Sequence, residues 1–113
     1  MDDCIFCKII KKEVPSTLVY ENEHIYAFRD IHPQAKTHIL VVTKKHISSL
    51  METNIGAEML KHLLEAIKEI TKKEKIDLSG FRIVTNNGPD AGQTVFHLHF
   101  HVLGGEKLSD KMA

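Results

Sequence analysis

The segment Val95–Gly105 (V-F-H-L-H-F-H-V-L-G-G) contains three histidines that alternate with apolar residues: His97, His99 and His101. Strict alternation predicts a β-strand, in which successive side chains point to opposite faces. The three imidazoles are therefore expected on one face. The opposite face is expected to pack in the core and carries Phe96, Leu98, Phe100 and Val102. Histidine is a mediocre strand former and a buried imidazole needs hydrogen-bond partners, so folding alone does not explain this row.

The spacing of the three histidines limits their use as metal ligands. Same-face neighbours on a strand are about 6.6–6.8 Å apart, which separates His97 from His101 by about 13 Å. Zinc–nitrogen bonds are only about 2.0–2.1 Å long. Two adjacent histidines could converge on one metal, but all three could not. A catalytic metal on one His-x-His pair, as in a metal-dependent hydrolase or oxygenase, remains an alternative.

A second feature with chemical potential is the pair Cys4-x-x-Cys7. The chain shows no export signal, which favours a metal site or a redox pair over a structural disulfide. A tetrahedral zinc site needs two further ligands. His46, after the third predicted strand, and His97, the first histidine of the row, would complete a Cys₂His₂ set. The alternative is two buried or reducible thiols.

The two remaining histidines, His99 and His101, are expected to face the same pocket. A neutral imidazole can act as a nucleophile or a general base near neutral pH, and attack on phosphorus would give a labile phospho-histidine. The preceding loop offers backbone N–H groups and side-chain donors for an anion. Its relevant residues are Gly88, Ala91, Gly92, Gln93 and Thr94. Alternatively, these glycines serve only the turn.

The rest of the chain supplies the elements that must position these groups. The pattern predicts a short helix within residues 4–12, ended by Pro15, and one long helix over 53–75. The long helix carries an apolar stripe of Met59, Leu60, Leu63, Leu64, Ile67 and Ile70. Strands are expected over 17–20, 25–29, 37–43, 81–86 and the histidine segment. This order predicts one α+β domain over residues 1–113, with helices that cover an antiparallel sheet.

Composition excludes several classes of function. The formal net charge is zero, which gives no bulk electrostatic argument for nucleic acid or for an anionic membrane. The longest uninterrupted apolar runs, such as Ile39–Val42, are too short to span a bilayer. The N-terminal M-D-D-C-I-F-C lacks the pattern of a signal peptide. A cytoplasmic protein is therefore expected.

Taken together, these motifs resemble a known family. The run H-L-H-F-H-V-L fits the histidine triad (HIT) pattern His-φ-His-φ-His-φ-φ, in which φ is apolar. The resemblance is closest to the Hint-like nucleotide-binding branch, in its bacterial zinc-containing form. It extends over almost the whole chain, through C-I-F-C-K-I-I-K-K-E-V-P, A-F-R-D-I-H-P-Q-A-K-T-H-I-L-V-V-T-K-K-H-I and N-N-G-P-D-A-G-Q-T-V-F-H-L-H-F-H-V-L-G-G.

The resemblance implies a fold and an activity. The fold would be a five-stranded antiparallel sheet with one short N-terminal and one long helix, paired into a homodimer with a ten-stranded sheet. The activity would be that of a purine nucleoside phosphoramidase-like hydrolase. Such an enzyme cleaves at the α-phosphate through a nucleotidyl-histidine intermediate and releases a nucleoside monophosphate. The alternative is a nucleotide- or partner-binding regulatory module with weak or vestigial catalysis.

The resemblance also implies roles for individual residues. His99 would be the nucleophile, with His101 and His38 at the phosphate. Asp30 would bind the ribose hydroxyls, and phosphate oxygens or the leaving group would be held by Asn86, Gln93 and Thr94. The apolar walls around the base would be Ile5, Phe6, Ile9, Phe28 and Ile31. A structural zinc would be held by Cys4, Cys7, His46 and His97. The tail E-K-L-S-D-K-M-A replaces a Trp-Pro-containing tail found in eukaryotic members, which leaves the leaving group undefined.

Overall fold

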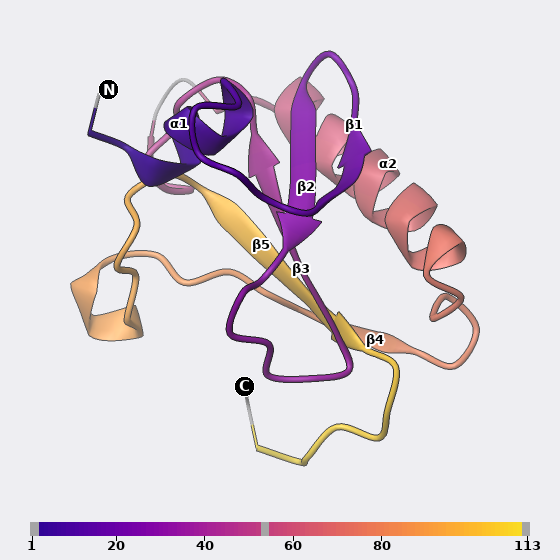
Figure 1. The fold of residues 1–113 in the computed structure, drawn as a ribbon. Coiled ribbons are helices and arrows are strands. Elements are labelled where there is room, and N and C mark those ends of the chain that lie inside the picture. The colour runs from indigo at the N-terminus through magenta and orange to yellow at the C-terminus, as the bar shows by residue number, and fades with distance from the viewer. Residues whose placement is uncertain (1–2, 53–54, 112–113) are drawn as a thin grey trace.

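A five-stranded antiparallel sheet forms the centre of the molecule (Figure 1). The computed structural model of the chain describes residues 3–52 and 55–111. The strands are β1 (Leu18–Glu21), β2 (Ile25–Arg29), β3 (Thr37–Thr43), β4 (Phe81–Val84) and β5 (His99–Gly104). They lie in the order β1-β2-β3-β5-β4. The helices are α1 (Ile5–Ile10), α2 (Ala57–Lys73) and the short 3₁₀ helix η1 (Pro89–Ala91). The α+β class and the five-stranded antiparallel sheet are therefore confirmed.

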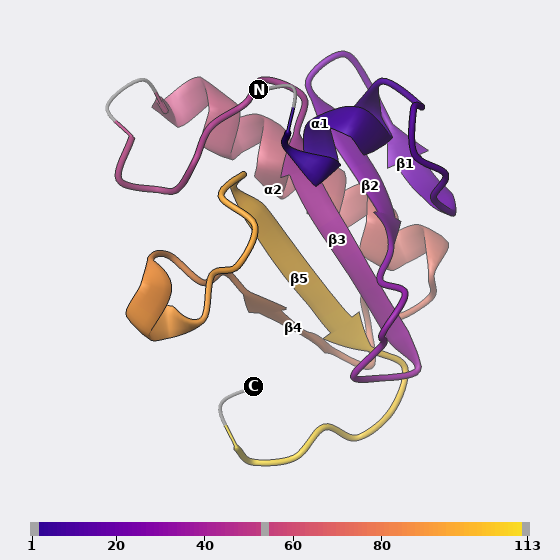
Figure 2. The same cartoon turned by 60° about the vertical axis from the view of Figure 1, so that its left-hand side comes forward.

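The two α-helices cover opposite faces of this sheet (Figure 2). On one face, α2 packs Leu63, Ala66, Ile67 and Ile70 against the strands. On the other, α1 packs Phe6 and Ile9. The central strand β3 contributes to both sides: Ile39 and Val41 face α2, whereas Leu40 and Val42 face α1. A strand covered on both faces requires a continuous apolar run, which explains the sequence I-L-V-V.

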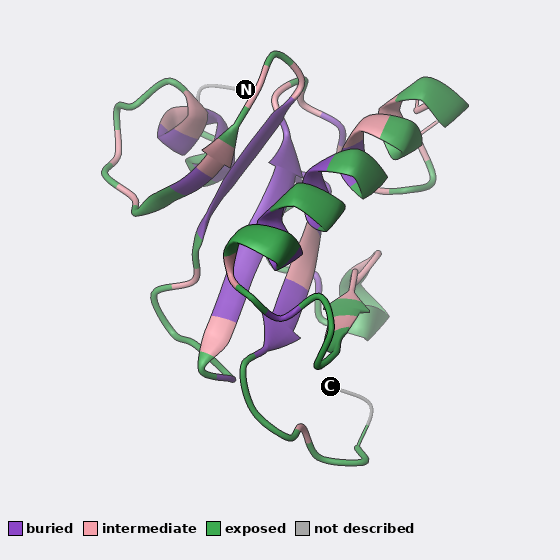
Figure 3. Ribbon diagram, turned by 90° about the vertical axis from the view of Figure 1, so that its right-hand side faces the viewer, coloured by how far each residue is buried: buried purple, intermediate pink, exposed green. Residues whose placement is uncertain are grey.

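The long helix differs from its prediction in extent and in its apolar face. It runs from Ala57 to Lys73, and the predicted residues 53 and 54 lie outside the described residues. Leu60 and Leu64 belong to the predicted apolar stripe, but they are 41% and 57% exposed. Figure 3 shows that much of the side of α2 that faces away from the sheet is exposed. The apolar stripe is therefore only partly buried in this chain.

The short helix α1 ends earlier than Pro15. Cys4 is its N-cap, and its thiol accepts a hydrogen bond from the Cys7 N–H at 3.4 Å. The helix ends at Ile10, and Lys12 adopts a left-handed conformation with φ of 64°. This backbone reversal, rather than the proline, terminates the helix. The strand over 81–86 is likewise shorter than predicted and ends at Val84.

The histidine strand begins two residues later than its first histidine. β5 starts at His99, because its partner β3 ends at Thr43 and the register already pairs Val42 with His99. The preceding residues leave the ladder, and the Leu98 N–H bonds the carbonyl of Ile47 at 2.6 Å. Leu98 is buried as predicted, but Phe96 is 52% exposed because it precedes the strand. The expectation that Phe96 packs in the core is therefore wrong.

Candidate functional site

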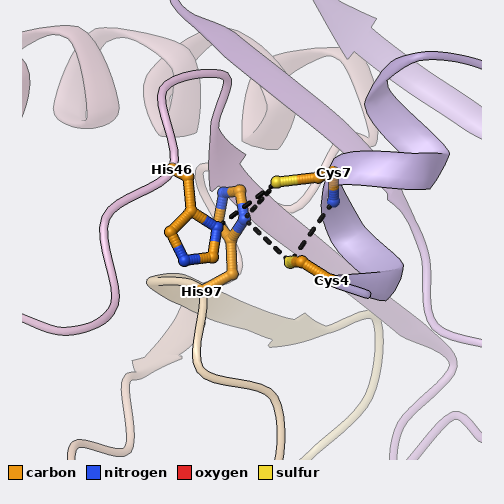
Figure 4. Close-up of side chains that lie close together, drawn as sticks. All are labelled: Cys4, Cys7, His46 and His97. Atoms are coloured by element: carbon orange, nitrogen blue, oxygen red, sulfur yellow. Dashed lines mark hydrogen bonds between the residues drawn. The ribbon is translucent and has the colours of Figure 1, made fainter. Parts of the chain in front are cut away.

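Four side chains from three separate segments form a Cys₂His₂ cluster (Figure 4). Cys4 and Cys7 come from the cap and first turn of α1, His46 follows β3, and His97 precedes β5. The Cys7 Sγ lies 3.3 Å from the His46 Nδ1 and 3.6 Å from the His97 Nδ1. The Cys4 Sγ lies 3.4 Å from the His97 Nδ1. The predicted ligand set is thus brought together.

The geometry of this cluster fits zinc. In a tetrahedron with Zn–S of about 2.3 Å and Zn–N of about 2.0–2.1 Å, sulfur and nitrogen are about 3.6 Å apart. The observed sulfur–nitrogen distances of 3.3–3.6 Å match this edge. Two thiolates and two imidazoles are also a common donor set of structural zinc. Four protein ligands complete the tetrahedron, which identifies a structural rather than a catalytic site.

The protonation of the ligands is set by their surroundings. The His97 Nε2–H donates to the Thr43 carbonyl at 2.7 Å, which leaves the Nδ1 lone pair directed at the sulfurs. Burial lowers the pKa of His97 to about 4, so the imidazole is neutral at pH 7. Burial raises the pKa of the Cys7 thiol, and the nearby Cys4 raises it further. A bound cation offsets this by favouring the thiolate.

A second group of polar side chains lies on a cavity of about 360 Å³ lined by His38, Asn86 and His101. The Gln34 N–H donates to the His38 Nδ1 at 3.0 Å, so the single proton of a neutral His38 sits on Nε2. That nitrogen lies 2.9 Å from the His101 Nδ1 and 3.4 Å from the Asp30 Oδ2. His101 therefore accepts at Nδ1 and carries its own proton on Nε2.

The neutral state that this chain of hydrogen bonds requires agrees with the electrostatics. Burial lowers the pKa of His101 to about 4, and the neighbouring His99 and His38 lower it further. Asp30 opposes these effects. Burial also lowers the pKa of His38, again against the attraction of Asp30. At pH 7 both imidazoles are neutral, and His101 is a hydrogen-bond donor rather than a cation.

The first residue of β5, His99, was predicted to be the nucleophile, and its ring is held by a backbone contact. Its Nδ1 lies 2.7 Å from the carbonyl of His97. Because a carbonyl only accepts, Nδ1 carries the proton and Nε2 keeps its lone pair. The His99 ring lies 5.2 Å from the ring of His101 and 5.0 Å from the ring of Phe6, which meets it edge-on. The side chain is buried, so its tautomer and orientation are both fixed.

The three residues predicted to hold phosphate are placed differently. Asn86 lines the cavity of His38 and His101. Gln93 is buried, and its amide bonds the Gly88 N–H and the carbonyls of Ser48 and Val95. Thr94 lines another cavity, beside Cys4 and His46. The structure therefore brings Asn86 to the histidines, whereas roles for Gln93 and Thr94 at the phosphate stay predictions.

The residues predicted to surround a base fall into two groups. Phe6, Ile9 and Phe28 are buried in the cluster between α1 and the sheet, where the rings of Phe6 and Phe28 are 5.6 Å apart. Ile31 is 85% exposed, and Ile5 is also exposed. The contact of Phe6 with His99 connects this apolar cluster to the predicted nucleophile. Their role toward a base stays a prediction.

Sequence reasoning missed the main-chain groups that fix these tautomers. The groups are the Gln34 N–H and the carbonyls of Thr43 and His97. Every residue has such groups, so no residue type signals their role. The only indication was the turn around Pro33, which brings the Gln34 N–H to the start of β3.

The comparison with known proteins agrees with this geometry. Residues 11–108 match the model of the HIT domain. The chain belongs to the HIT family. A 14 kDa zinc-binding protein of Zea mays is 46% identical over 110 residues, which cover 93% of this chain and 84% of the maize protein. This relative supports the zinc assignment of the Cys₂His₂ cluster, and zinc is the cofactor that the four ligands fit.

Two solved structures extend the likeness to the whole fold. A HIT family hydrolase from Clostridium thermocellum is 43% identical, with a TM-score of 0.94 and coverage of 100% of this chain and 99% of that chain. A histidine triad nucleotide-binding protein from Candida albicans is 36% identical, with a TM-score of 0.82 and coverage of 98% and 87%. Within residues 3–52 and 55–111, no helix has the length and apolar character needed to cross a membrane.

Proposed function

We propose that this HIT protein is a hydrolase of purine nucleotide conjugates, in the manner of a nucleoside phosphoramidase. It cleaves at the α-phosphate and releases a nucleoside monophosphate. The single observation that carries this proposal is the His97 carbonyl, which holds the proton of His99 on Nδ1 and leaves the Nε2 lone pair free. The hydrolase and nucleotide-binding relatives support the same chemistry.

The reaction proceeds in two displacements. In the first, the Nε2 of His99 attacks the α-phosphorus, the P–N or P–O bond to the leaving group breaks, and the leaving group takes up a proton. In the second, water attacks the phosphorus of the nucleotidyl-histidine, the P–N bond to His99 breaks, and the monophosphate leaves. The second displacement restores the neutral His99 imidazole with its proton on Nδ1, and the proton released by the attacking water balances the one that the leaving group takes up in the first.

The hydrogen-bond chain that ends at His101 serves these displacements. Its Nε2–H donates to a non-bridging oxygen of the phosphate, where negative charge develops in the transition state. His38 keeps this tautomer in place because it donates to the His101 Nδ1. Asn86 adds a side-chain amide at the same cavity. The donors are therefore oriented before substrate arrives, which avoids reorganisation during the reaction.

The remaining roles concern the nucleoside and the zinc. Asp30 accepts hydrogen bonds from the ribose hydroxyls, and the purine packs against the apolar group of Ile5, Phe6, Ile9, Phe28 and Ile31. Gln93 and Thr94 contribute to the phosphate or the leaving group once the loop that carries them adjusts. Zinc supplies no reacting group and ties α1 to the segments that lead to His46 and His97.

A homodimer completes the proposal. β4 is an edge strand of the sheet, and its Phe81 and Ile83 are exposed. Leu60 and Leu64 form an exposed apolar row on α2. Uncovered apolar side chains next to an unpaired strand edge favour association with a second copy, which would extend two five-stranded sheets into one of ten strands.

The experiment is a turnover assay on a panel of purine nucleoside phosphoramidates beside a dinucleoside polyphosphate. His99→Ala is expected to reduce kcat by at least about 10³-fold while nucleotide binding remains measurable. His62→Gln is the matched control, because His62 stacks on His24 far along the chain from the triad. Wild-type turnover in the His99→Ala variant would refute the mechanism. Nucleotide binding without turnover in the wild type would identify a binding module instead.

A further inference from the structure

One cluster of potential metal ligands is not used by the structural zinc. Asp30, His38 and His101 each offer a ligand atom, and all three atoms lie within 4.8 Å of one another. Two imidazole nitrogens and one carboxylate oxygen are ligands that bind zinc and related transition metals. Asp30 directly follows β2, His38 lies in β3 and His101 lies in β5.

The distances suit a tetrahedral ion. The Asp30 Oδ2 lies 3.4 Å from the His38 Nε2, which is about the edge of a tetrahedron with metal–ligand bonds of 2.0–2.1 Å. The two imidazole nitrogens are 2.9 Å apart because a proton lies between them. An ion in place of that proton would need this distance to grow by about 0.4 Å. A small rotation of either ring provides such a change.

The carboxylate is already held in a suitable orientation. The Asp30 Oδ1 accepts a hydrogen bond from the His32 N–H at 2.8 Å, which leaves Oδ2 directed at His38. The His38 side chain is 3% exposed and that of Asp30 is 18% exposed. The cavity of about 360 Å³ that His38 and His101 line gives an ion access and leaves room for a fourth, exogenous ligand.

We propose that Asp30, His38 and His101 form a second, weaker site for Zn²⁺, and that an ion bound there blocks the active site. Binding moves the proton of His38 from Nε2 to Nδ1. The Gln34 N–H then loses its acceptor and turns to water, which its exposed position allows. The fourth ligand is water or a phosphate oxygen. The inhibition, but not the metal binding, rests on the proposed function.

This arrangement implies competition between metal and nucleotide. The ion binds the Asp30 carboxylate, which is proposed to bind the ribose. It also binds the His101 Nδ1, which otherwise accepts the hydrogen bond from His38. The active site would therefore respond to zinc in excess of one ion per chain. Three protein ligands, without thiolate, predict weaker binding than in the Cys₂His₂ site, so the structural site fills first.

The test uses the full chain loaded with one Zn²⁺ per chain and then titrated with Co²⁺ as a probe. The expected result is a second equivalent whose visible bands lack a thiolate charge-transfer band. Its affinity is expected to fall at least tenfold in Asp30→Asn and in His38→Gln. His62→Gln, which alters the half-buried, stacked His24–His62 pair, is the matched control and should bind Co²⁺ like wild type.

A second readout locates the ion without reference to activity. The Gln34 amide resonance should shift on metal binding, because its hydrogen bond to His38 is lost. No second equivalent, an unchanged Gln34 amide, or a second equivalent lost in His62→Gln but kept in Asp30→Asn would each overturn the proposal. Zinc inhibition of turnover is measured last. Metal binding with no detectable turnover in the zinc-loaded enzyme would refute the hydrolase and leave the site intact.

Discussion

Substitution of Cys4 by serine separates the two roles of this residue. Its thiol caps α1 through the Cys7 N–H and also belongs to the zinc cluster. Serine is among the best N-cap residues, so the cap is retained. A serine hydroxyl is a poor zinc ligand at neutral pH because it stays protonated. Cys4→Ser therefore removes a metal ligand at little other cost to α1.

The loss of stability expected in Cys4→Ser can be worked out from the length of the loop that the zinc closes. Cys7 and His97 are 90 residues apart in the sequence. In the loop-closure model, a cross-link of that span reduces the entropy of the unfolded chain and so stabilises the folded state by about 4–5 kcal/mol at 25 °C. Measured cross-links contribute about 2–4 kcal/mol. For 113 residues this corresponds to a Tm lower by roughly 8–16 °C. The variant still folds, because Phe6 and Ile9 remain buried.

Metal content and thermal unfolding monitored by circular dichroism test this prediction. Wild type is expected to hold one zinc per chain and Cys4→Ser well below one. Wild type after removal of zinc by a chelator should melt near the Cys4→Ser variant, and the chelator should not change the variant further. The reasoning fails if wild type loses its zinc and keeps its Tm.

Three further predictions concern the core, the pH response and the surface. Leu98→Ala removes a fully buried side chain and should lower the free energy of unfolding by about 2–5 kcal/mol, measured by urea titration. Between pH 6.5 and 4, an unfolded His101 gains a proton that the folded form, with a pKa of about 4, does not take up. The free energy of unfolding should therefore decrease as the pH is lowered from 6.5 to 4, by at most about 3.4 kcal/mol. His101→Asn should reduce the slope of the free energy of unfolding against pH. Leu64→Glu places a charge on the exposed row of α2 and should convert the proposed dimer to monomer in light scattering; an unchanged mass would exclude that interface.

The parts of the fold that the sequence predicted are those governed by local pattern. β2 and β3 begin and end at the predicted residues, because each is an apolar or β-branched run bounded by polar turns. The zinc ligands could also be predicted, since thiols and imidazoles are few in this chain and few other roles suit a Cys-x-x-Cys pair. Side chains with distinctive chemistry, such as thiols and imidazoles, can be identified from the sequence before their geometry is known.

The parts that could not be predicted depend on partners far along the chain. β5 begins at His99 because β3 ends at Thr43, a fact about another strand. Phe96 is exposed for the same reason. The burial of the Gln93 amide depends in part on the carbonyl of Ser48, which lies 45 residues away in the sequence. Alternation alone predicts which residues share a face, but it does not predict where a ladder ends.

The register between β3 and β5 explains how three histidines with identical side chains acquire different roles. Pairing of Leu40 with His101 places His101 diagonally opposite His38 on the α1 face of the sheet, within reach of a hydrogen bond. His99 pairs with Val42 at the last position of the ladder, and the carbonyl of His97, two residues before the strand, accepts a hydrogen bond from its Nδ1. His97 lies beyond the ladder and turns toward the sulfurs of α1. A slip of one residue would move His99 and His101 to the α2 face and separate them from His38. The same strand pairing that builds the sheet therefore separates the zinc ligand from the proposed nucleophile and the proposed phosphate donor.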